Sequence, residues 1–184
     1  MALSFGDKTA EYEGRLTLNP IKHIDWFGSI ILPFLLYITN AGFMIGWAKP
    51  VPYNPYNLKH RKIAEPLVAL AGPLSNLFVA IVFGIAVRIL ISNGMGASPL
   101  VLLFGFVVLI NISLAIFNLI PIPPLDGSKI LFSFIPQGRF AFSAAAQKYG
   151  LVLIIALFIF LPWIAGIISP VISSLFTLMT GISA

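Results

Sequence analysis

Apolar residues run along this chain in long stretches that hold one charged side chain at most. A helix needs about 20 apolar residues to cross the hydrocarbon core of a bilayer. The stretches therefore predict membrane spans near 28–48, 66–91, 99–120 and 150–179. The last stretch is long enough to tilt, or to break at one of its prolines into a span and a re-entrant piece.

The first 27 residues have a different pattern, which is polar and mixed in charge. Arg15 to Leu18 alternate between polar and apolar positions, and Asn19-Pro20 then stops the alternation, as in a short strand followed by a turn. A strand beside lipid needs a partner for its backbone groups. Residues 47–53 could supply one at a sheet edge, where their prolines are tolerated. The pattern thus predicts a short β-hairpin-like segment over residues 1–27.

Composition identifies the class of protein. Of the 184 residues, 59% are hydrophobic and 9% are charged, and the mean hydropathy is +1.00. These values are typical of a membrane protein. Four spans also leave no room for a separate soluble domain. We therefore expect one integral membrane domain over residues 1–184, an all-α polytopic fold with about four transmembrane helices.

The net charge of +5 has a simpler use than nucleic-acid binding, because Lys and Arg in a polytopic protein first set its orientation in the bilayer. The expected partner is the lipid bilayer, and no nucleic acid is expected. With four spans, the segments 49–65 and 121–148 share one side and carry seven Lys and Arg, while 1–27 and Arg88 carry four on the other. That count favours the first side as cytoplasmic. The absence of cysteine excludes disulfides and thiolate metal sites.

Asp126 is the first candidate for chemistry, because it is a single carboxylate at the end of an uncharged apolar run. Pro121, Pro123 and Pro124 cannot continue a helix, so the chain is expected to unwind just before Asp126-Gly127. An acid at membrane depth costs roughly 2.5 to 3.5 kcal/mol and marks a functional site by default. Unwound backbone at that depth is tolerated only beside protein or a watery cavity.

Small and amide side chains form a second group of candidates. Gly72, Ser75 and Asn76 predict a polar notch, which either packs against a neighbouring helix or grips an extended peptide backbone. Asn118 lies two helical turns after Asn111, so their amides share one face of a helix. Such amides join helices as often as they bind a ligand.

Four segments together resemble the site-2 protease family of intramembrane zinc metallopeptidases, in particular its compact prokaryotic members. They are GDKTAEYEGRLTLNPIKHID at 6–25, WAKPVPYNPYNL at 47–58, AGPLSN at 71–76 and FNLIPIPPLDG at 117–127, in the family's order and spacing. The resemblance covers nearly the whole chain. It implies a multi-pass protein of a prokaryotic inner or plasma membrane that cleaves peptide bonds in or near the transmembrane segments of a protein substrate.

The same resemblance implies zinc as the cofactor. In the family, two histidines of an H-E-x-x-H motif and the aspartate of a later LDG-type motif hold the metal, and that aspartate is Asp126 here. Gly72 and Asn76 would contact the substrate. The residues that would surround the active site are Asn118, Pro124 and Gly127.

One departure from the family is decisive, because no H-E-x-x-H occurs in this sequence. His23 and His60 are the only histidines, and they are not expected to replace the ligands; His23 is expected to pair with Asp25 instead. In relatives the motif helix comes immediately before the GDxTA segment. The catalytic glutamate is therefore expected upstream of Met1, no catalytic residue is expected within the chain, and zinc binding and hydrolysis by residues 1–184 alone are not expected.

Two other functions stay open at this point. A protein that natively lacks the motif would be a non-catalytic membrane peptide-binding relative. A small transporter would also use broken helices and buried amides, but that architecture predicts internal repeats, and AGPLSN does not resemble IPIPPLDG. The substrate, the pathway and the oligomeric state do not follow from the sequence.

Overall fold

The structure is a computed structural model of the chain. It describes residues 1–17, 19–40, 42, 46–49, 51–123, 125–135, 160 and 163–183. The chain divides into two compact units, Met1–Ala64 and Glu65–Ala184. Every regular element in the described residues is helical, which confirms the predicted all-α class.

Three helices of the described residues are long and apolar enough to cross a membrane: α3 (Arg61–Ser92), α4 (Pro99–Leu119) and a C-terminal helix, Trp163–Thr180. Each overlaps one of the predicted spans. Most of their large apolar side chains are exposed, as in Phe78 and Ile167. Apolar side chains exposed along long helices face lipid rather than water. The chain is therefore an all-α membrane protein.

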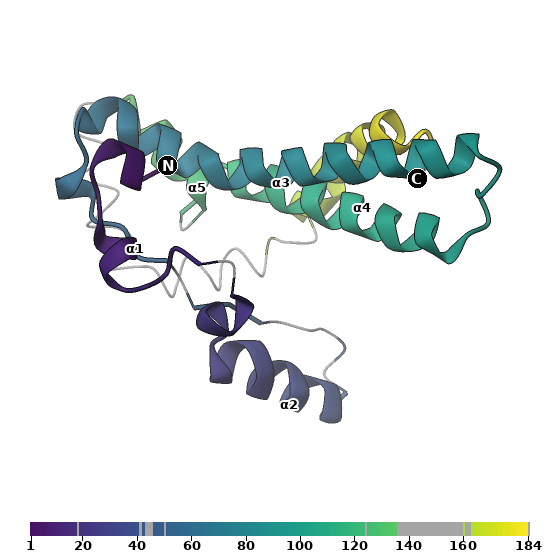
Figure 1. Cartoon of the computed structure of the whole chain (residues 1–184), viewed down its shortest axis with the longest axis horizontal. Helices are drawn as coiled ribbons and strands as arrows, with labels where there is room; N and C mark the ends of the chain where they lie inside the picture. The colour runs from purple at the N-terminus through teal and green to yellow at the C-terminus, as the bar shows by residue number, and fades with distance from the viewer. Residues whose placement is uncertain are drawn as a thin grey trace. The chain divides into compact units, whose positions relative to one another are not determined.

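The second unit is held together by a small core between these helices. Figure 1 shows α3 and α4 lying side by side in opposite directions, joined by residues 93–98. Ala80, Val108 and Ile112 are fully buried between them. The partly buried side chains packed against this core are Phe83, Ile116, Ile172, Leu175, Phe176 and Met179. The C-terminal helix thus completes a three-helix arrangement.

Close backbone approach and one cation fix the C-terminal helix against α3. A Cβ at Gly84 would lie 3.0 Å from the Met179 carbonyl oxygen, so a larger residue would push the C-terminal helix away by a few tenths of an ångström. One turn later, Arg88 donates from Nε to the Met179 carbonyl at 2.9 Å and from Nη2 to the Leu178 carbonyl at 2.5 Å. These carbonyls belong to the last turn of the helix, where a cation is favourable.

Prolines inside the membrane helices do not end them. Pro66 and Pro73 lie within α3, and Pro170 lies within the C-terminal helix. Of the two predicted break points in the last span, Pro170 leaves the helix continuous and Pro162 lies outside the described residues. Membrane helices tolerate proline where neighbouring groups satisfy the freed carbonyls.

The first unit is made of short elements. They are η1 (Leu3–Phe5), α1 (Thr9–Tyr12), η2 (Pro20–His23), the π-helix η3 (Trp26–Ile31), α2 (Leu32–Ile38) and η4 (Pro55–Asn57). The predicted β-hairpin is wrong, since the described part of residues 1–27 contains no strand. Asn19 caps η2 by accepting from the Ile21 N–H, and Arg15 donates to the Lys22 carbonyl. These local bonds satisfy groups that a strand would have paired.

Within the predicted span over 28–48, the described helical part is Trp26–Ile38, which is shorter than a membrane span. The helix ends because Thr39 bonds back to the Leu35 carbonyl and Asn40 takes a left-handed conformation with φ of 47°. Residues 41 and 43–45 lie outside the described part of the chain.

Candidate functional site

The end of α4 is built as the prolines predict. The helix stops at Leu119, and Ile120 is extended with φ of −62° and ψ of 130°. Tight turns follow, in which the Ile122 N–H donates to the Ile120 carbonyl at 2.8 Å and the Leu125 N–H donates to the Ile122 carbonyl at 2.9 Å. The unwound backbone therefore satisfies many of its own polar groups. Pro124, one of the predicted surrounding residues, lies outside the described residues.

The first turn of α5 (Asp126–Ser133) packs tightly on the end of α4. Gly127 is buried, and a Cβ there would lie 2.2 Å from the Leu119 carbonyl oxygen and 2.6 Å from that of Ile120. Ser128 is fully buried and donates to the Leu125 carbonyl at 2.5 Å. Glycine at position 127 is thus required for the approach, and this packing fixes Asp126 at the helix N-terminus.

The carboxylate of Asp126 lies between two neighbours. Its Oδ1 accepts from the Lys129 ammonium at 2.7 Å, and about a third of each side chain is exposed, at 30% and 31%. Its Oδ2 lies 3.6 Å from the point where a Cβ would stand on Gly72 of α3. The carboxylate therefore lies beside the backbone of α3, at a distance where a Cβ on residue 72 would be in ordinary van der Waals contact with it. The structure thus brings together two of the predicted site residues, Asp126 and Gly72.

The notch on α3 is polar at this point. Ser75 donates to the Gly72 carbonyl at 2.7 Å, and Pro73 between them is fully buried. Asn76 is half-buried, and its amide makes no hydrogen bond within the part of the chain that the structure describes. The amide of Asn76, one helical turn after Gly72, can therefore still donate and accept hydrogen bonds.

The asparagines of α4 are partly satisfied by their own helix. Asn118 donates to the Leu114 carbonyl at 2.9 Å, and Asn111 donates to the Val107 carbonyl at 2.8 Å. Each amide bonds four residues back, which is a common arrangement for polar side chains in membrane helices. The remaining oxygen of Asn118 is free of this bond and can accept another.

The two histidines lie in the first unit. Nε2 of His23 lies 3.0 Å from the Thr17 carbonyl, and Asp25 instead accepts from the Gly28 N–H and caps η3. The expected His23–Asp25 pair is therefore wrong, because Asp25 is used as a helix cap. His60 is exposed, with φ of 50°. Among the described residues, no three His, Cys, Asp or Glu side chains come together as a metal site.

Sequence reasoning missed Asp7, a buried carboxylate in the first unit. Its side chain is 2% exposed, and its oxygens accept from Thr9 Oγ1, the Thr9 N–H, the Asn54 N–H and Asn57 Nδ2. Burial alone would raise the pKa of Asp7, but these hydrogen bonds outweigh it and hold the pKa below its usual value. The Asp-x-Thr spacing was the available signal, since such side chains bond the backbone two residues on. Asp7 ties residues 7–9 to residues 54–57.

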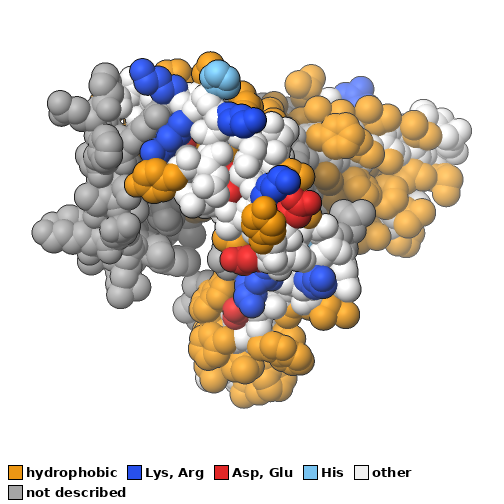
Figure 2. Space-filling view, turned by 60° about the vertical axis from the view of Figure 1, so that its left-hand side comes forward, with side chains coloured by type: hydrophobic (Ala, Val, Ile, Leu, Met, Phe, Trp, Pro, Cys, Tyr) orange, Lys and Arg blue, Asp and Glu red, His pale blue; other side chains and the backbone are white. Residues whose placement is uncertain are grey.

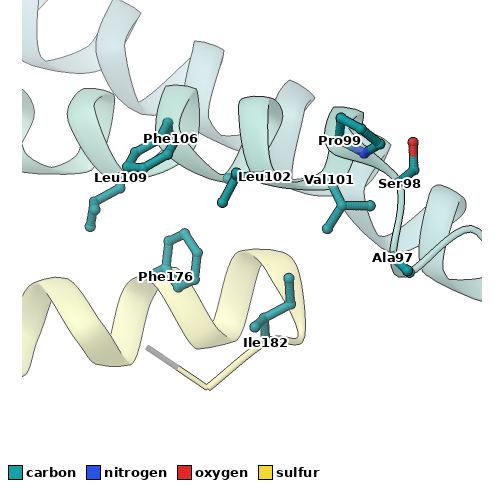
Figure 3. A pocket seen from close by; sticks show the side chains of 11 residues that line it. Ala97, Ser98, Pro99, Val101, Leu102, Phe106, Leu109, Phe176 and Ile182 are labelled. Atoms are coloured by element: carbon teal, nitrogen blue, oxygen red, sulfur yellow. The ribbon is translucent and has the colours of Figure 1, made fainter.

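An apolar cavity of about 540 Å³ lies elsewhere in the second unit, between α4 and the C-terminal helix. Figure 3 shows Phe106 and Leu109 of α4 facing Phe176 across it. Its lining contains no titratable side chain and none of the predicted site residues. The cavity therefore supplies no catalytic group.

The fold and the site together define a class, a helical membrane protein with a carboxylate just after a broken helix. Comparison with known proteins gives its family. Residues 87–161 match peptidase family M50. The chain is 40% identical over 164 residues to the "Putative zinc metalloprotease YwhC" of Bacillus subtilis, a match that covers 86% of this chain and 71% of that protein. The chain therefore belongs to the M50 peptidases, the site-2 protease family, as the sequence predicts.

More distant relatives carry the same kind of name. MJ0611 of Methanocaldococcus jannaschii is 35% identical over 58% of this chain and 52% of its own length, and Rip2 of Mycobacterium tuberculosis is 31% identical over 86% and 59%. Both are named as zinc metalloproteases. The chain thus spans less than two thirds of these two relatives. No solved structure matches it.

Proposed function

We propose that this chain carries the substrate notch and the third zinc ligand of a site-2-type metalloprotease, which cleaves peptide bonds in or near transmembrane segments of other membrane proteins. The observation that carries the proposal is the position of Asp126. Its carboxylate follows a broken membrane helix and lies against Gly72 of another membrane helix. We further propose that the two units form one multi-pass domain in a prokaryotic inner membrane.

The donor chemistry of Asp126 fits one position of a zinc site and no more. A carboxylate is a zinc ligand, and this one is partly exposed and held by a cation on only one oxygen. A surface ion pair of this kind contributes about 0 to 1 kcal/mol, so it is a small obstacle to a metal. Two imidazoles and a general base still have to come from an H-E-x-x-H helix, which residues 1–184 do not contain. By themselves they are therefore proposed to be inactive.

Zinc, when bound, would lower the pKa of a coordinated water and make it a nucleophile near neutral pH. The chain's own residues would position the substrate and the ligand. Asn76, whose amide has no hydrogen-bond partner among the described residues, would bind the backbone of an extended peptide, and Gly72 would leave that backbone room to approach. Gly127 and Ser128 hold the first turn of α5 on α4, which keeps Asp126 in place. The substrate must unwind locally, since helical hydrogen bonds hide its scissile carbonyl.

A non-catalytic peptide-binding membrane protein is the second candidate. It is favoured by one observation, the absence of H-E-x-x-H from the sequence. The same notch of Gly72 and Asn76 would then bind a peptide segment without cleaving it.

Zinc content distinguishes the two candidates. We would purify residues 1–184 alone and the same residues together with whatever the reading frame upstream of Met1 encodes, and measure bound metal by elemental analysis. Stoichiometric zinc only in the longer protein supports the protease. Zinc in neither favours the non-catalytic binder, and zinc in residues 1–184 alone would show that the ligand set is wrong.

Asp126→Ala tests the proposed ligand in the longer protein. We expect loss of zinc and of cleavage of a transmembrane substrate, because the third ligand is removed. The control is Glu13→Ala, which removes an exposed carboxylate in the first unit. An Asp126→Ala protein that keeps its zinc and its activity would end the assignment of Asp126.

A further inference from the structure

The helix Trp26–Ile38 is apolar, exposed and too short to cross a membrane. It consists of six residues of η3 and seven of α2. At 1.5 Å per residue it is about 20 Å long, against about 30 Å for the hydrocarbon core. A segment of this length is more often a core, interfacial or re-entrant helix than a span.

The chain at the start of this helix is hydrogen-bonded to the chain that follows it, at residues 47–49. The Trp47 N–H donates to the Gly28 carbonyl at 3.1 Å, and Ser29 Oγ donates to the Trp47 carbonyl at 2.7 Å. The Lys49 N–H donates to the His23 carbonyl at 2.8 Å. The chain therefore leaves at residues 23–29 and is back beside them at residues 46–49.

Side-chain packing closes the same junction. A Cβ at Gly28 would lie 2.3 Å from Nε1 of Trp47, so the indole lies directly on the glycine backbone. The rings of Phe27 and Trp47 are 6.0 Å apart between centroids. If residues 28–48 crossed the bilayer, Gly28 and Trp47 would stand about 30 Å apart at opposite interfaces. These contacts exclude that arrangement.

The exposed side chains of the helix indicate the kind of environment that surrounds it. Most of its large apolar side chains are exposed, including Trp26 at 75%, Phe34 at 63% and Ile38 at 61%, whereas Leu32, Pro33 and Leu36 on one face are half-buried. An exposed apolar surface of this kind marks contact with a membrane or with another protein. Figure 2 shows these side chains gathered in one protrusion, with Lys, Arg, Asp and Glu side chains immediately above it. Residues 1–64 carry seven Lys and Arg against four Asp and Glu.

We propose that Trp26–Ile38 is a re-entrant element that enters one leaflet of the bilayer and returns to the side from which it came. Its apolar side chains contact lipid acyl chains. The cations of residues 8–25 and 49–62 lie at the level of anionic headgroups, which they complement in charge. Trp26 and Trp47, which lie where the chain enters and returns, are exposed aromatics of the kind that occupy membrane interfaces.

This topology changes the predicted orientation of the protein. Residues 1–25 and 49–62 then share one side, and Lys129 returns to that side after α3 and α4. Eight of the nine Lys and Arg in the described part of the chain are then on one side, with only Arg88 near the other end. The positive-inside rule places the side with eight cations in the cytoplasm. The count of seven against four assumed a span over residues 28–48, which the re-entrant element replaces.

Cysteine labelling tests the topology, and it is convenient because the chain has no native cysteine. Three single variants report on three segments: Glu13→Cys, Val51→Cys and Met95→Cys, all at exposed positions. Each is treated with a membrane-impermeant maleimide in spheroplasts and in inside-out vesicles, and labelling in detergent proves that each thiol is reactive. We expect positions 13 and 51 to be labelled only in inside-out vesicles and position 95 only in spheroplasts.

Each outcome of the labelling has a clear meaning. Positions 13 and 51 labelled from opposite sides would overturn the re-entrant element. Both labelled only in spheroplasts would keep the re-entrant element and overturn the cytoplasmic orientation. The labelling needs neither zinc nor proteolysis, so its result tests the re-entrant element independently of the proposed function.

Lipid contact at the tip is tested by fluorescence quenching. A Phe34→Cys protein carrying an environment-sensitive fluorophore is placed in vesicles that contain lipids with brominated acyl chains. We expect strong quenching at position 34 and little at position 13, labelled in the same way. An unquenched label at position 34 would mean that protein, from this chain or a second copy, covers the helix, and would overturn lipid as its neighbour.

Discussion

Gly127→Ala is the sharpest test of how the chain holds Asp126. The added Cβ would stand 2.2 Å from the Leu119 carbonyl oxygen, whereas ordinary contacts begin at 3.4 Å, so the two backbones must separate by about 1.2 Å. Both groups are backbone, and no flexible side chain can yield. Overpacking of this kind costs typically 1–3 kcal/mol. We therefore expect the free energy of unfolding in detergent micelles to fall by about that amount.

The same displacement of α5 should reduce zinc affinity, through Asp126, more than it reduces the stability of the fold. Asp126 is the adjacent residue, and metal–ligand distances tolerate only about 0.2 Å. In a protein that also carries an H-E-x-x-H helix, Gly127→Ala should therefore lose zinc affinity under conditions where the helices are still folded. Circular dichroism and metal analysis on one preparation compare the two effects.

Gly96→Ala is the matched control, because nothing lies within 4 Å of a Cβ at that position and its backbone is not left-handed. The methyl group should fit there at little cost. If Gly127→Ala and Gly96→Ala unfold with the same free energy, α5 does not pack on the end of α4 in the way described. If Gly127→Ala is destabilised but keeps full zinc affinity, the packing is right and the role of Asp126 is wrong.

Two further predictions follow from side-chain hydrogen bonds, one set at exposed Arg88 and the other at buried Asp7. Arg88→Gln should destabilise the C-terminal helix by about 1.5–3 kcal/mol, since bonds to the last-turn carbonyls of Leu178 and Met179 lose a charged donor; Arg88→Lys should recover part of the loss in denaturant unfolding. Asp7→Asn should cost about 1–3 kcal/mol by placing an amide against donors. Because the folded pKa of Asp7 is lowered, its contribution is present above the ordinary value of 3.8 and is lost as the pH falls through the folded pKa. An acid titration of unfolding followed in both proteins should show this loss in the native chain alone.

Some of the site could be predicted from the sequence because it depends on local chemistry. A single proline is tolerated inside a membrane helix, but three prolines within residues 121–124 remove too many N–H donors for the helix to continue, so the end of α4 before Asp126 follows from the sequence. The long uncharged stretches likewise predict α3 and α4. The predicted β-hairpin failed because alternation over Arg15 to Leu18 is a weak signal, and the side chains of Arg15 and Asn19 satisfy the local backbone in another way.

The predicted span at 28–48 rests on composition alone, because the stretch is apolar enough to cross a bilayer. The re-entrant element that we propose in its place rests on tertiary contacts. The return of the chain depends on Trp47 lying on Gly28 and on hydrogen bonds between residues 18 or more positions apart. Such contacts leave no periodic pattern in the sequence.

By itself, the sequence determined that this is an all-α membrane protein of the site-2 protease family, with a lone aspartate after a broken helix. Hydropathy, proline chemistry and motif order are properties of neighbouring residues, and each can be evaluated without coordinates. Only the tertiary structure decided that Gly72 meets Asp126, that Lys129 pairs with it, and that residues 23–29 meet residues 46–49. These are contacts between elements, and packing selects them from many arrangements that the same hydrophobic pattern allows.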